Sequence, residues 1–158
     1  MPNTRTVWLW LSNEEPSYRH IEAMAKECLE QACDNESHAT TARNDAVERL
    51  AEIIEEHVRE GMPDASGMWG ELISSALHSV DFEEVARDWL ADFKIYSVFS
   101  SDSEDAELFT DEDLARECLL EKVDPESDPD GAKACRIQDM QPGSTVNIEG
   151  TEYTLGVS

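Results

Sequence analysis

Apolar residues recur at helical spacing through the first part of the chain. The stripes predict four helices, over about 14–33, 47–58, 68–77 and 82–90. Gly61 and Pro63 should end the second helix, and Asp81 should cap the fourth, with Glu84 completing a capping box. We expect the helices to form a bundle whose centre holds two tryptophans and four other apolar residues: Trp69, Trp89, Leu50, Ile54, Leu72 and Phe82.

The segment before the first helix has a different pattern. Residues 6–11 alternate weakly and are rich in Trp, Val and Leu, which favours a short strand or a buried entry segment. Ser12 and Glu15 then have the spacing of a capping box. The first helix should therefore begin just after Ser12.

The periodicity changes again after Asp92. Residues 94–100 are β-branched and aromatic, which predicts a strand, and residues 110–122 have the pattern of a helix. Residues 134–139 are a candidate short strand. Two β-rich segments flank Glu149-Gly150 and predict a tight hairpin, with arms over 146–148 and 151–155.

Within residues 110–122, Thr110 is the expected helix cap, and the expected inward side chains are Leu114, Cys118 and Leu119. The sequence therefore predicts an α+β fold. A mainly helical bundle of about four helices should occupy residues 1–93. A small strand, helix and hairpin unit, with an acidic loop, should follow in residues 94–158.

The chain is strongly acidic, with 36 Asp and Glu against 12 Lys and Arg and a formal net charge of −24. Nucleic acids and anionic membranes would repel such a protein, whereas a basic protein surface would attract it. The charge is uneven, because residues 102–130 alone hold 13 acidic and 2 basic residues. We expect a basic protein surface as the partner, and neither direct nucleic-acid binding nor membrane binding.

The apolar runs and the cysteines both indicate in which cellular compartment the protein resides. No apolar run approaches the ~20 residues that span a bilayer, and the apolar segment 7–11 is too short for a signal-peptide core. Cys28 and Cys33 lie five apart on a predicted helix, which is poor geometry for a bridge or a zinc site. We expect these thiols, with Cys118 and Cys135, to be small apolar residues of a cytoplasmic protein that binds no metal.

Signals of catalysis are missing from the sequence. There is no Gly-rich phosphate loop, no His-Glu-x-x-His zinc motif and no Gly-x-Ser-x-Gly elbow. His57 follows two glutamates that point to other helix faces. The acidic run 124–131 contains two prolines and lacks the terminal Glu of a calcium loop. We therefore expect no enzyme activity and no cofactor.

Two stretches carry a resemblance to a group of proteins. Residues 6–15 (TVWLWLSNEE), followed by Tyr18, resemble the opening of small acidic proteins encoded by phages, plasmids and related mobile elements. Residues 76–86 (ALHSVDFEEVA) are similar to the closing pattern of the same group. The resemblance covers about the first 90 residues and implies a mobile-element setting, where acidic proteins of this size often disarm host defences. It brings no functional residues with it.

Acidic residues also form rows at helical spacing. Side chains at i, i+3 and i+4 lie ~5–6 Å apart, which is of the same order as phosphates along a strand. The candidate partner-binding residues are Glu48, Glu52, Glu55, Glu56, Asp111, Asp113, Glu117 and Glu121. Together with the resemblance, they predict an inhibitor of a host nucleic-acid-binding defence complex, of the anti-restriction or anti-CRISPR type, acting by DNA mimicry.

Salt adaptation and a docking role also agree with the sequence. Adaptation to a high-salt host would produce the same acidity, with the rows as ordinary solvated faces. The uneven charge favours mimicry, because solvation has no reason to concentrate acids in residues 102–130. The chain could also be a non-catalytic accessory or regulatory protein that docks through apolar helix faces or the hairpin edge.

Overall fold

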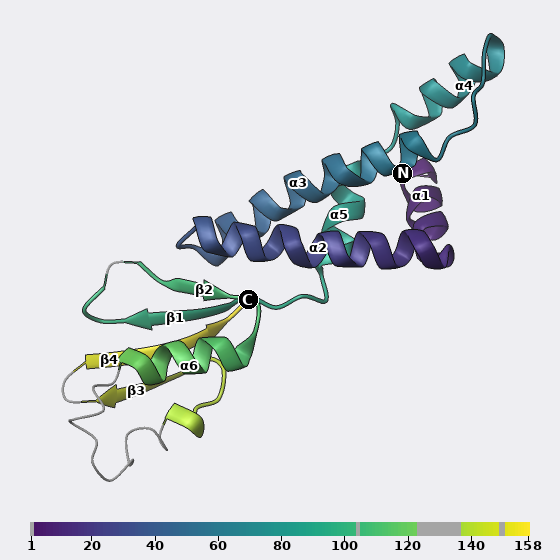
Figure 1. Ribbon diagram of the computed structural model, residues 1–158. Coiled ribbons are helices and arrows are strands. Elements are labelled where there is room, and N and C mark those ends of the chain that lie inside the picture. Colours follow the sequence, from purple (N-terminus) through teal and green to yellow (C-terminus); the bar gives the residue numbers. More distant parts are fainter. Residues whose placement is uncertain (1, 104, 123–136, 149–150) are drawn as a thin grey trace. The chain divides into compact units, whose positions relative to one another are not determined.

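The computed structural model describes residues 2–103, 105–122, 137–148 and 151–158. The fold is α+β, as predicted (Figure 1). The chain divides into two compact units. Unit 1 comprises Met1–Cys28 and Asn44–Asp92, and unit 2 comprises Leu29–Arg43 and Phe93–Ser158. The predicted division at residue 93 differs from this one in the segment Leu29–Arg43, which groups with the strands.

One arginine accounts for part of that grouping. The guanidinium of Arg43 donates to the carbonyl oxygen of Phe93 at 2.8 Å and to that of Ser158 at 3.3 Å. A single side chain thus ties the segment Leu29–Arg43 to both ends of the segment that follows residue 92. The partners lie 50 and 115 residues away along the chain, so no local pattern indicates them.

Five helices contribute to unit 1, one more than the sequence predicted. They are α1 (Pro2–Asn13), α2 (Glu15–Asn35), α3 (Ala39–Glu60), α4 (Met68–Leu77) and α5 (Phe82–Leu90). Helix α1 stands where residues 6–11 favoured a short strand or a buried entry segment, because so short an apolar run fits a helix as well as a strand. Ser12 lies inside α1 and donates to the Leu9 carbonyl at 3.2 Å, so the predicted capping box with Glu15 does not form.

The core of unit 1 is made of aliphatic side chains. Its fully buried members include Leu11, Ile21, Ala25, Leu50, Ile54, Ala86 and Leu90. Leu50 and Ile54 were predicted correctly. The prediction was wrong for α4, where Trp69 is 66% exposed and Leu72 is 52% exposed. Spacing identified an apolar helix face but could not indicate whether another element covers it.

Helix α5 begins at the predicted cap. The Asp81 carboxylate accepts from the Glu84 backbone N–H at 2.9 Å, as expected. The Asp81 N–H, however, donates to Thr4 Oγ1 at 3.0 Å, so that donor is already satisfied by α1. Asn3 adds a bond from its amide nitrogen to the Ala76 carbonyl at 3.3 Å. These polar contacts join α1 to the end of α4 and to the start of α5.

Unit 2 contains a four-stranded antiparallel sheet in the order β2-β1-β4-β3. Its elements are β1 (Tyr96–Ser100), β2 (Glu107–Phe109), α6 (Glu112–Lys122), β3 (Ser144–Ile148) and β4 (Thr151–Val157). The strand predicted over 94–100 is confirmed as β1, and the predicted hairpin is confirmed as β3 and β4, in which Ile148 pairs with Thr151. Strand β2 was not predicted, because three residues are too few to show alternation.

Helix α6 packs on this sheet through its small apolar face. Ala115 and Leu119 are fully buried. Leu114, which was predicted to point inward, is 53% exposed. The cap is Asp111 and not Thr110, since Asp111 Oδ1 accepts from the Asp113 N–H at 2.8 Å. The carboxylate outcompetes the hydroxyl as an N-cap.

The predicted strand over 134–139 is wrong in its described part, because residues 137 and 138 are helical. The remainder of that prediction, and the acidic run 124–131, lie outside the described residues.

Candidate functional site

Four of the predicted partner-binding residues lie along α3. The opposite face of this helix is buried through Val47, Leu50, Ile54 and Val58, which leaves the acidic positions outside. Three of these acids are spaced four residues apart and have exposed side chains that pair with no described residue: Glu48, Glu52 and Glu56. Stacked one turn apart, they form a negative row, called the α3 row below.

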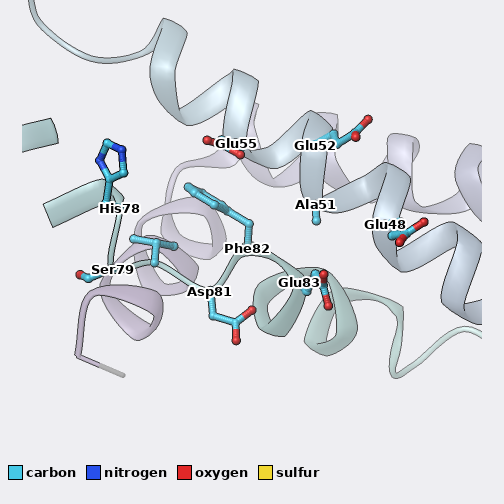
Figure 2. A pocket seen from close by; sticks show the side chains of 10 residues that line it. Glu48, Ala51, Glu52, Glu55, His78, Ser79, Asp81, Phe82 and Glu83 are labelled. Carbon is cyan, nitrogen blue, oxygen red and sulfur yellow. The ribbon is translucent and has the colours of Figure 1, made fainter. Parts of the chain in front are cut away.

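Two members of the α3 row, Glu48 and Glu52, line a groove of about 820 Å³ that lies within unit 1 (Figure 2). Glu48, Ala51, Glu52 and Glu55 line it from α3, and residues 78–83 line it from the segment leading into α5. Figure 2 shows the ring of Phe82 pointing toward α3, whereas the Asp81 carboxylate turns away from α3. The lining of the groove thus combines acidic side chains from α3 with the apolar Ala51, Val80 and Phe82 and with the polar His78 and Ser79.

Two arginines neutralise part of the groove. Arg59 pairs with Glu55 at 2.5 Å, and Arg87 pairs with Glu83 at 2.6 Å. Both pairs are partly exposed, so each adds little stability. Glu48 and Glu52 have no such partner among the described residues. The groove can therefore attract a cationic group to the end nearest these two residues.

The fourth member of the predicted set, Glu56, does not line this groove. Glu56 borders a separate hollow of about 430 Å³ along α3, together with Glu52, Glu55, Arg59 and Glu60. The structure therefore brings Glu48, Glu52 and Glu55 together with α5, but not Glu56.

The other predicted residues belong to α6 and its cap in unit 2. Asp113, Glu117 and Glu121 have exposed side chains, as a recognition row would need. Asp111 instead caps the helix with its carboxylate, so it has a structural role. The two predicted rows lie in different units.

One cluster of polar side chains was not predicted. Ser17, which is only 3% exposed, contacts both the Glu14 carboxylate and His57 Nε2, the latter at 2.9 Å. A carboxylate only accepts, so the Ser17 hydroxyl donates to Glu14 and accepts from the His57 N–H. A nucleophilic serine needs the reverse, an imidazole that takes its proton. This cluster is a buried polar tie between α2 and α3.

The same cluster contains two further aromatic rings. The rings of His57 and His20 have centroids 5.1 Å apart, and those of His57 and Trp10 are 6.2 Å apart. The serine and the histidine are 40 residues apart, so no local motif could indicate the contact.

The described thiols have environments that suppress reactivity. Burial raises the pKa of the Cys33 thiol to about 11 and also raises the pKa of Cys28. Burial, and a hydrogen bond from Sγ to Glu107 at 3.2 Å, raise the pKa of Cys118 to about 12. Since the thiolate is the reactive form, these cysteines are poor nucleophiles. Cys135 lies outside the described residues.

In the part that the structure describes, no three His, Cys, Asp or Glu side chains are placed to hold a metal ion. None of the described helices is long and apolar enough to cross a membrane. No protein-family model, curated protein or solved structure matches this chain. The resemblance to mobile-element proteins therefore stays a prediction.

Proposed function

We propose that this chain is a non-catalytic inhibitor that binds the basic surface of a nucleic-acid-binding defence complex. The observation that carries the proposal is the α3 row, three carboxylates one turn apart that pair with no described residue, on a helix whose other face is buried. A helix anchored in this way holds the backbone of the row in place. The backbone therefore loses little conformational entropy on binding.

The sign of the charge supports the choice of partner. Surfaces that bind nucleic acid carry clustered Lys and Arg, because they must neutralise a regular row of phosphates. A protein with a net charge of −24 is steered toward such a surface and away from nucleic acid itself. By covering the surface, the chain would exclude the nucleic acid that normally occupies it.

A competition experiment tests this function. The immobilised protein is exposed to a nuclease-treated host lysate, and retained proteins are eluted with double-stranded DNA and identified by mass spectrometry. We expect nucleic-acid-binding proteins to be retained and to be released by DNA. Retained proteins that bind DNA and this chain at the same time would contradict inhibition by occupation.

The matched variants change the same number of charges within unit 1. Glu48→Gln, Glu52→Gln and Glu56→Gln together should reduce retention at least about tenfold, as loss of complementary charges lowers association. The control combines Glu71→Gln, Glu84→Gln and Asp88→Asn, which are exposed and outside the groove. Equal losses in both variants would show that only the overall charge acts.

A second candidate function rests on α4. Its side chains Met68, Trp69 and Leu72 are 65%, 66% and 52% exposed, which is unusual for large apolar residues on neighbouring turns. An accessory protein that docks through an apolar helix would need such a face. If Trp69→Ala abolishes retention of the captured proteins and the α3 row variant does not, this function replaces the first.

A further inference from the structure

We propose that the groove between α3 and the start of α5 takes an arginine-bearing peptide segment of the basic partner. This inference rests on the proposed function and specifies what the acidic surface recognises. A groove of about 820 Å³ suits a few side chains of one segment, because ligand pockets commonly span ~300–1,000 Å³. Recognition would thus be of a peptide segment, and not of a flat basic surface alone.

Charge complementarity identifies the occupant as cationic. Glu55 and Glu83 already have arginine partners, and the Asp81 carboxylate caps α5. Glu48 and Glu52 are exposed and without a described partner, so they can still accept hydrogen bonds from an incoming donor. A guanidinium can bind one carboxylate through two parallel N–H donors, which adds direction to the attraction.

The aromatic ring of Phe82 in the groove favours arginine over lysine as the bound side chain. Phe82 is half-buried, and Figure 2 shows its ring pointing toward α3 among the acidic residues. A planar, weakly hydrated guanidinium stacks on an aromatic face, whereas an ammonium is compact and holds its water more strongly. Ala51 and Val80 complete an apolar lining that suits the methylenes of the same side chain.

The test uses two fluorescein-labelled peptides of equal length and charge. They are identical except that every arginine of one is a lysine in the other. Anisotropy titrations with the full chain at low salt should give about three- to tenfold tighter binding of the arginine peptide. Equal affinities for the two peptides would overturn the inference.

Variants locate the binding. Phe82→Leu keeps the apolar volume and removes the aromatic face, so it should abolish the preference for arginine. Glu48→Gln with Glu52→Gln should weaken both peptides at least about fivefold, whereas the control Glu84→Gln with Asp88→Asn should leave both unchanged. Circular dichroism of each variant checks the fold. Loss of affinity in the control pair equal to that in the groove pair would contradict a groove site.

A second measurement needs no variant. In amide NMR spectra, the arginine peptide should shift the signals of residues 48–55 and 78–83. Shifts spread over all acidic helices would overturn the groove assignment. The two proposals fail separately: if the peptides do not discriminate while lysate retention still depends on the α3 row, the groove inference fails and the inhibitor function stands.

Discussion

Leu50 and Trp69 differ in what surrounds their side chains. Leu50 is 0% exposed, whereas Trp69 is 66% exposed. We expect Leu50→Ala to lower the free energy of unfolding by about 2–5 kcal/mol, because it leaves a cavity. Trp69→Ala should cost less than about 1 kcal/mol, because water replaces the exposed ring. Urea denaturation measures both. A Trp69→Ala variant as unstable as Leu50→Ala would mean that the ring is covered in solution.

At this scale, a sequence predicts which residues are apolar but not which are covered. Leu50 and Ile54 lie on a long helix with a continuous buried stripe, and their burial was predicted correctly. Trp69 and Leu72 follow the same spacing, but α4 buries only Leu77. The Ser17 contact with His57 was beyond prediction, since it depends on how two helices align.

At the scale of the element, the two ends of one predicted motif have different roles. Asp81 caps α5 through its carboxylate, whereas its own N–H is satisfied by Thr4 and not by Glu84. We therefore expect Asp81→Ala to lower the free energy of unfolding by about 0.5–2 kcal/mol. Glu84→Ala should cost only about a few tenths of a kcal/mol, through loss of a charge near the helix N-terminus. Thermal unfolding compares the variants, and equal losses would restore the capping box.

Helices α2 to α6 and the hairpin were predictable because each has periodicity, a cap or a turn within a few residues. Helix α1 was not, since its apolar run is equally consistent with a strand and its partners are α5 and the segment before it. For the candidate site, spacing predicted the α3 row. It could not predict the groove beside that row, because the other wall comes from residues 78–83.

At the scale of the whole molecule, acidic rows lie in both units, whereas the groove beside α3 lies within unit 1. Each unit carries an exposed acidic row on a helix, α3 in unit 1 and α6 in unit 2. Glu48 and Glu52 of the α3 row line a groove that also contains the ring of Phe82. Solvation alone explains why a row of acidic residues is exposed. It does not explain why two of these carboxylates, Glu48 and Glu52, have no described partner and lie beside the half-buried ring of Phe82. The two rows therefore need separate tests.

The α6 row offers the test that separates recognition from adaptation to salt. Asp113→Asn, Glu117→Gln and Glu121→Gln together remove three exposed charges and spare Asp111, whose carboxylate caps the helix. Because like charges along a helix repel one another, stability should be unchanged or slightly higher. If the row is a recognition surface, affinity for a basic partner should fall, mainly through a slower association rate.

The measurements are unfolding stability and partner affinity for this variant and the wild type, each at low and high salt. Under recognition, wild-type binding should itself weaken as salt rises, since screening shortens the reach of exposed charges, and the variant should be less sensitive. Under salt adaptation, the affinity should stay constant while solubility and salt-dependent stability change. An unchanged affinity would remove the α6 row as a binding surface and leave the α3 row as the one candidate for mimicry among the described residues.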